Sequence, residues 1–206
     1  MNIEKLKRDN PIAYFVDRMR IVWEVPDEDE DLIARTFLRL WPATKLAIRS
    51  QFNKEGVLKK SLDDFYVPAA ENMDQAELDM DFYNLLVGMD LYLYNTGRYQ
   101  EEISYVQDLL VLFDWPDSDP AVDSLRVSIG DAYEAMGLFD ERDRYFAALL
   151  SSGQNEYIAG SYALCHLNHM DLEKAEEILQ PYKNSEDELI KSCFEMLEQF
   201  KNDQKK

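Results

Sequence analysis

The sequence has few of the residues on which cross-linked or turn-rich folds depend. It contains two cysteines, seven glycines and seven prolines among 206 residues. Two thiols 28 positions apart, Cys165 and Cys193, do not make a disulfide framework for a chain of this size. The shortage of glycine and proline argues against a turn-rich β fold and against a low-complexity chain. Both cysteines are therefore predicted to be small residues of a buried core.

Long apolar segments are also missing. Uninterrupted hydrophobic runs extend over only a handful of residues, whereas a membrane-spanning helix needs about 20. The first 25 residues are charged from Glu4 onward and include no apolar stretch of signal-peptide length. We therefore expect a cytoplasmic protein that does not enter a membrane.

Basic residues become scarce after residue 70. The net charge is -19, yet residues 1–70 hold 12 basic and 12 acidic residues, so the whole excess lies in residues 71–206. A surface with this charge repels phosphate backbones, and nucleic acid is not expected as a partner of that part. Hydrophobic residues still make up 46% of the chain, which is enough to bury a sizeable core.

The apolar residues that are present recur at helical spacing almost throughout the chain. Asn10-Pro11 is typical of a helix start, and the acidic run 27–31 suits the N-terminus of the next helix. Pro42 is predicted to stop or kink that helix near Trp41, because it lacks a backbone donor. A separate helix is expected over 43–52.

From about residue 75, helices are predicted in pairs, at 73–95 with 98–113, 121–136 with 139–150, and 156–169 with 172–182, followed by a last helix at 186–201. The expected fold class is all-α.

Three segments of the second part repeat one pattern. Residues 95–110, 135–150 and 169–179 each begin with a turn, continue with an aromatic residue or leucine, and then show acidic residues and an apolar stripe. Gly97 and Gly137 stand at the turn in the first two segments, and Met170 matches them in the third. The spacing from Gly97 to Gly137 and from Gly137 to Met170 is typical of stacked helical hairpins. Such hairpins stack because a single hairpin cannot bury its apolar face alone.

The most complete unit lies at 123–153. Its distinctive positions are Ile129, Gly130, Tyr133, Gly137, Phe139 and Phe146. This pattern resembles the tetratricopeptide repeat (TPR) family, whose unit is about 34 residues of helix–turn–helix. The resemblance implies a right-handed α-solenoid of antiparallel helix pairs, with two to three degenerate repeats over about 80–183. It divides the chain into an N-terminal helical region, 1–75, and a TPR-like region, 76–206, that ends in a capping helix. The repeats depart from the family at three positions. A small alanine is replaced by Glu102 in the first unit and by Arg142 in the second, and Asp90 of the first unit stands where the family has glycine or alanine.

No motif for catalysis is found in the sequence. It has no glycine-rich phosphate loop, nucleophile elbow or dinucleotide fingerprint. Cys165, His166 and His169 are the only cluster with metal-ligand residue types, but a zinc site would need a fourth ligand and the chain has no C-x-x-C pair. The sequence therefore predicts a protein that is not an enzyme and that holds no cofactor or metal.

A partner surface follows from the resemblance. In the family, ligand peptides usually lie along the concave face formed by the first helices of the units. In this chain that face would include Tyr94, Asn95, Asp131, Glu134, Tyr157 and Asn168. No lysine or arginine is among these residues, so the carboxylate clamp of the family's chaperone-binding members is not expected. Their acidic and aromatic side chains suit a basic or amphipathic segment instead.

The expected function is a non-catalytic protein-protein interaction module, or scaffold, whose partner is a protein or peptide. A homodimer stays open. The alternative is a regulator that senses a peptide with its repeats and contacts nucleic acid with the basic segment 35–60. That segment could equally pair with acidic helices, inside the molecule or across a dimer. A third class is an enzyme whose active site has no recognisable motif.

Overall fold

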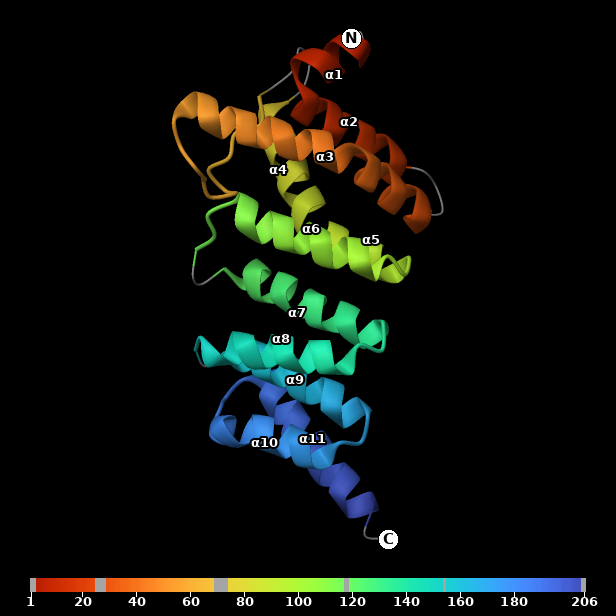
Figure 1. Cartoon of the computed structure of the whole chain (residues 1–206), viewed down its shortest axis with the longest axis vertical. Coiled ribbons are helices and arrows are strands. Elements are labelled where there is room, and N and C mark those ends of the chain that lie inside the picture. Colours follow the sequence, from red (N-terminus) through yellow and green to blue (C-terminus); the bar gives the residue numbers. More distant parts are fainter. Residues whose placement is uncertain (1–2, 25–28, 69–73, 117–118, 154, 205–206) are drawn as a thin grey trace. The chain divides into compact units, whose positions relative to one another are not determined.

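The computed structural model describes residues 3–24, 29–68, 74–116, 119–153 and 155–204 (Figure 1). These ranges contain eleven α-helices, one 3₁₀ turn and no strand, which confirms the all-α fold class. No helix within them is long and apolar enough to cross a bilayer. The chain separates into two compact units, residues 1–122 and 123–206. The boundary predicted from the sequence, 75/76, instead lies before the first predicted repeat.

The first unit is built around an aromatic core. Its helices are α1 (Ile3–Asp9), α2 (Pro11–Trp23), α3 (Glu30–Glu55), α4 (Gln75–Val87), α5 (Met89–Asn95) and α6 (Tyr99–Leu112). Helix α2 packs against α1, α3 and α4, and α5 packs against α3 and α6. The Phe37 ring lies 5.8 Å from that of Phe15 and 4.8 Å from that of Tyr105, both edge-on. The helices predicted at 73–95 and 98–113 therefore share a core with the N-terminal helices.

Two helix starts agree with the sequence signals. The Asn10 side chain accepts a hydrogen bond from the Ala13 amide at 3.1 Å, and Pro11 occupies the first turn of α2. Asp29 caps α3 in the same way, accepting from the Leu32 amide at 2.9 Å. Each cap satisfies an amide that has no partner within the helix. Residues 27 and 28 of the acidic run lie outside the described ranges.

Pro42 does not end a helix, so the predicted stop near Trp41 was wrong. Helix α3 continues without interruption from Glu30 to Glu55, and no separate helix exists at 43–52. The Pro42 side chain is exposed, whereas Trp41 and Thr44 on either side of it are buried. Packing of both halves of α3 on the same core stabilises a continuous helix despite the lost donor.

Gly88 divides the helix that the sequence predicts over 73–95. Helix α4 ends at Val87 and α5 begins at Met89. Residue 73 lies outside the described ranges. The other helices of the pairs lie within a few residues of their predicted limits, since their ends carry stronger capping and turn signals.

The second unit is a stack of helices around α9 (Figure 1). It contains α7 (Pro120–Ala135) from its first turn onward, α8 (Phe139–Ser151), α9 (Glu156–Asn168), α10 (Leu172–Leu179), a 3₁₀ turn (Gln180–Tyr182) and α11 (Glu188–Asp203). Helix α9 packs against α8, α10 and α11. Cys165 and Cys193 are free and buried, as predicted, and burial raises the pKa of the Cys193 thiol to about 11.

Helices α7 and α9 run parallel. At their N-terminal ends, the Asn155 side-chain amide donates to Asp123 at 2.6 Å. At their C-terminal ends, the His169 ring contacts the Glu134 carboxylate. Alternate helices of consecutive hairpins have this relation, and α8 connects the two.

The three aligned turns have the same backbone geometry. Gly97, Gly137 and Met170 all adopt the left-handed conformation, with φ of 70°, 72° and 60°. In each turn the amide of this residue donates to the carbonyl three residues earlier. The amide of the next residue donates to the carbonyl five residues before it, which is that of Leu93, Tyr133 or His166. This pattern satisfies carbonyls that the helix end leaves without partners. The sequence alignment therefore predicted the turn at Met170, although no glycine is there.

The helices that follow these turns also agree in burial. Glu102 and Ala175 are fully buried at the aligned position, and Arg142 is 3% exposed. At Gly130, a Cβ atom would lie far inside contact distance of the Phe146 ring atoms Cε2 and Cζ. The absence of a side chain at Gly130 therefore allows α8 to approach α7 closely.

We expect Met170→Gly to raise the free energy of unfolding of the second unit by about 1 kcal/mol, because a non-glycine residue is disfavoured at positive φ. Urea titration followed by circular dichroism measures the effect. The matched control is Gly137→Ala, which should lower stability by a similar amount, since no atom lies within 4 Å of the added Cβ and only the backbone responds. A neutral or destabilising Met170→Gly would contradict the prediction.

Candidate functional site

Two of the six predicted site residues belong to the first unit. Tyr94 and Asn95 are the last residues of α5. The Asn95 side-chain amide donates to Glu30 at 3.0 Å, and the Tyr94 ring packs edge-on against Tyr99 with centroids 5.3 Å apart. Both side chains therefore contact other residues of their own unit.

The other four predicted residues lie on α7 and α9. Asp131 and Glu134 are one turn apart on α7, near its C-terminal end. Asn168 is the last residue of α9 and is exposed, next to the His169 ring that contacts Glu134. Tyr157 is near the start of α9, about 16 Å away along the helix axis. The structure thus gathers three of these residues at one end of the α7–α9 pair and separates Tyr157 from them.

Tyr157 borders a different hollow. This depression has a volume of about 640 Å³ and lies between the N-terminal ends of α9 and α11. Asn155, Tyr182 and Asp187 also line it. The Asn155 and Asp187 side chains accept hydrogen bonds from backbone amides of the helices they cap, so their oxygens are already used.

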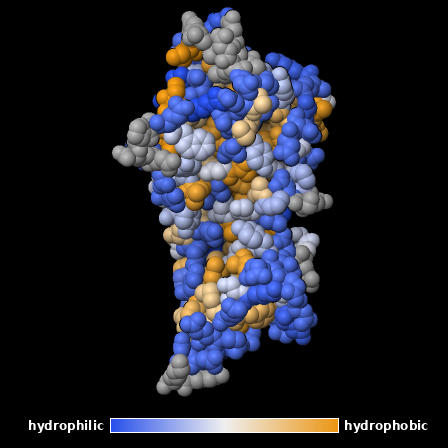
Figure 2. Space-filling view, turned by 180° about the vertical axis from the view of Figure 1, so that it is seen from behind, coloured by the Kyte–Doolittle hydropathy of each residue, from blue (hydrophilic) through white to orange (hydrophobic). Residues whose placement is uncertain are grey.

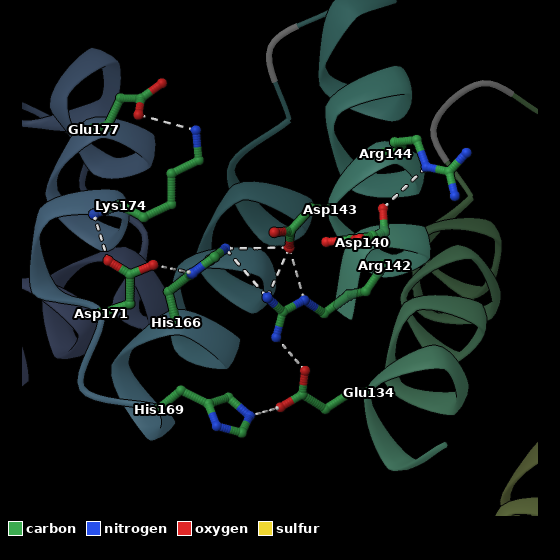
Figure 3. A network of polar contacts seen from close by, with 10 residues as sticks. All are labelled: Glu134, Asp140, Arg142, Asp143, Arg144, His166, His169, Asp171, Lys174 and Glu177. Atoms are coloured by element: carbon green, nitrogen blue, oxygen red, sulfur yellow. Dashed lines mark hydrogen bonds and ion pairs between the residues drawn. The ribbon is translucent and has the colours of Figure 1, made fainter. Parts of the chain in front are cut away.

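Glu134 is half-buried and bound on both of its carboxylate oxygens (Figure 3). Oε2 pairs with Nη1 of Arg142, and Oε1 contacts Nε2 of His169. A cation from a partner would have to compete with these contacts. The sequence predicted Glu134 as a partner-binding residue, but it did not reveal the contacts of this carboxylate with Arg142 and His169.

Arg142 is the centre of a buried polar network (Figure 3). Its Nε donates to Oδ1 of Asp143 at 2.8 Å, and its Nη2 lies 2.7 Å from the same oxygen. Burial by itself lowers the pKa of the guanidinium, but hydrogen bonds to Asp143 and Glu134 outweigh burial and raise that pKa above its ordinary value. The guanidinium also lies 5.3 Å from the centroid of the Phe139 ring. The network joins α7, α8 and the end of α9.

His166 extends the network towards α10. Its Nε2 lies 3.3 Å from Asp143, and its Nδ1 lies 3.1 Å from Oδ2 of Asp171. Asp171 also caps α10, since its Oδ1 accepts from the Lys174 amide at 3.2 Å. Both ring nitrogens of this buried histidine therefore face carboxylates.

The Cys165–His169 cluster does not form a ligand set. Burial, together with Asp131, raises the pKa of the Cys165 thiol to about 12, which disfavours the thiolate that a metal needs. His166 and His169 face carboxylates from different helices. Within the described ranges, no three His, Cys, Asp or Glu side chains are arranged to hold a metal ion.

Asp131 differs from Glu134 because it has no internal partner. None of the described residues donates a hydrogen bond to its carboxylate or pairs with it. Burial, and secondarily the charge of Glu134, raises the pKa of Asp131 from 3.8 to about 6. A carboxylate that is partly desolvated without a compensating cation costs stability in the ionised form.

We expect Asp131→Asn to stabilise the protein near neutral pH, by on the order of 1 kcal/mol. Because the folded pKa is raised, the stabilisation from the protonated carboxyl is present below about pH 4 and is lost as the pH rises through about 6. The difference between variant and wild type should therefore grow between these values. Urea titrations at a series of pH values measure it, and a difference that is constant or of opposite sign would contradict the assignment.

The basic segment 35–60 is partly used inside the first unit. Lys45 pairs with Asp108 of α6, which confirms the predicted pairing with an acidic helix for this residue. Lys60 pairs with Glu55. Arg39, Arg49 and Lys54 are exposed on α3. The segment thus combines internal ion pairs with a short solvent-facing basic stripe.

Sequence reasoning missed the polar network and an exposed apolar patch. Arg142 was noticeable as a charged residue at a position where the family has alanine, but its partners come from three helices and could not be read from the chain. Figure 2 shows that one face of the molecule is mostly hydrophilic, with apolar side chains in separate patches. Exposed apolar residues in the second unit include Leu138 and Met170, in the two turns beside the network, and Phe139 at the start of α8.

No family model, curated protein or solved structure matches the chain.

Proposed function

We propose that the protein is a non-catalytic protein-protein interaction module of TPR-like stacked helical hairpins. The C-terminal end of the α7–α9 pair would bind a basic segment of a partner protein. The observation that supports this proposal is Asp131, a half-buried carboxylate on α7 with a raised pKa and no cation paired with it among the residues that the structure describes.

A lysine or arginine of a partner would supply what Asp131 lacks. Its positive charge would offset the desolvation of the carboxylate and lower its pKa towards the ordinary range. The interaction would take place beside Glu134, whose charge is already balanced by Arg142, so the partner meets one uncompensated acid rather than two. Such a charge pair favours specificity and association rate.

Local packing supports the idea of a preformed surface. Gly130 allows Phe146 of α8 to pack directly on the α7 backbone, which fixes the hairpin. The Arg142 network then connects this hairpin to α9. A rigid surface loses little conformational entropy on binding, and the binding energy is then available for recognition.

Affinity capture from the native cell, with Asp131→Lys beside the wild type, tests the proposal. The expected result is at least one protein that the wild type captures and the variant does not. Glu195→Lys on α11 is the matched control, because it makes the same charge reversal at an exposed residue that forms no ion pair with any residue in the described ranges. Circular dichroism confirms that both variants fold. The proposal is wrong if Asp131→Lys captures the same proteins as Glu195→Lys.

A further inference from the structure

Two neighbouring turns of the second unit form an exposed apolar patch. Leu138 lies in the turn between α7 and α8, and Phe139 begins α8 directly after it. His169 and Met170 belong to the turn between α9 and α10. The rings of Phe139 and His169 lie edge-on with centroids 4.9 Å apart, so the two turns are in contact. Leu138, Phe139 and Met170 are 39%, 42% and 47% exposed. We call these four residues the turn patch.

Met170 is unfavourable for the isolated protein in two ways. It adopts a left-handed conformation that the two equivalent turns assign to Gly97 and Gly137. Its side chain, nearly half exposed, recovers little free energy from burial. Strain and exposure at the same residue reduce stability with no gain in internal packing, and such costs concentrate at functional positions.

The surroundings of the turn patch are acidic. Asp140 directly follows Phe139, and Glu173 is three residues after Met170. Both side chains are exposed, and neither carboxylate forms an ion pair with any described residue. The whole second unit has 17 acidic and nine basic residues. Anionic lipid and nucleic acid would be repelled by this rim, whereas a positively charged peptide would be attracted.

We propose that the turn patch is a docking surface for a short partner segment in which an apolar side chain lies next to lysine or arginine. The apolar side chain would cover Met170 and Leu138, and the basic one would face Asp140 or Glu173. This inference rests on the proposed function and adds the chemistry of the partner. Apolar contact at the centre with charges at the rim is the usual organisation of protein interfaces.

A library of random dodecapeptides displayed on phage, selected against the full-length protein, is the probe. The selected peptides should contain an apolar residue within a few positions of lysine or arginine. As synthetic peptides, they should bind Met170→Gly at least about tenfold more weakly than the wild type. Met170→Leu keeps an apolar side chain and should bind like the wild type. Because Met170→Gly is expected to stabilise the fold, its loss of binding cannot result from unfolding.

The same peptides separate this inference from the proposed function. If Asp131→Lys abolishes binding and Met170→Gly leaves it unchanged, the acidic surface stands and the turn patch is overturned. If neither variant weakens binding, or if no peptide is enriched, both proposals fail. Sedimentation of wild type and Met170→Gly excludes another occupant, since a dimer that only the wild type forms would assign the turn patch to a second copy of the chain and overturn the peptide proposal.

Discussion

Arg142→Met is expected to lower the free energy of unfolding of the second unit by about 3 kcal/mol or more. The methionine fills much of the same volume, so the main loss is the positive charge at a site that is 3% exposed. Glu134 and Asp143 would then face the buried region without their cation. An uncompensated buried charge is one of the few causes of a destabilisation this large.

Urea titration of both proteins by circular dichroism measures the effect of Arg142→Met. Arg144→Met is the matched control, because this arginine lies two residues further along the same helix and is exposed. Among the described residues it pairs only with Glu141 and the backbone carbonyl of Asp140. Its replacement should cost less than about 0.5 kcal/mol. The double variant Arg142→Met with Glu134→Gln should be more stable than the sum of the single changes predicts. Equal effects of the two arginine replacements would show that the network does not stabilise the fold.

Gly130→Val is the second change with a large expected effect, a loss of about 2–3 kcal/mol or failure of α7 and α8 to pack. Helix propensity alone predicts the opposite sign, because glycine inside a helix is unfavourable by about 1 kcal/mol relative to alanine. The Phe146 ring decides the sign, since it occupies the space that any side chain at 130 would need. The same urea titration measures the change.

A compensating change makes the Gly130 prediction specific. Phe146→Leu removes the ring edge that a side chain at 130 would meet, so Gly130→Ala should cost less in that background than in the wild type. Gly153→Ala provides the control, because no atom lies within 4 Å of its added Cβ. The packing explanation is falsified if Gly130→Ala is as harmless as Gly153→Ala in the wild-type background.

The local features of the repeat could be predicted because they depend on residues close in sequence. The spacing of Gly97, Gly137 and Met170 identified three turns of one geometry. Pro42 was misinterpreted because a local rule was applied to a helix that is held on both sides of the proline by its core. Tertiary packing outweighs a local preference of this size.

The site was predicted only in part, because sequence shows which residues share a helix face but not which polar groups meet across helices. Asp131 and Glu134 look alike on α7, yet only Glu134 meets a guanidinium, and that guanidinium comes from α8. Asn168 is the last residue of α9, at the end where His169 contacts Glu134. Tyr157 was grouped with it although the length of α9 separates the two. The turn patch had a signal in the sequence, an apolar residue where the matching turns have glycine, but Met170 was interpreted only as the matching turn position.

All three tryptophans, Trp23, Trp41 and Trp115, belong to the first unit. The rings of Trp41 and Tyr105 lie 5.2 Å apart in the aromatic core, so unfolding of that core will change tryptophan emission. The second unit has tyrosines but no such chromophore. Tryptophan fluorescence therefore reports on one unit alone, and circular dichroism reports on both. Recording the two signals on the Arg142→Met protein would reveal whether the units lose their structure together or one after the other, without any label or truncation.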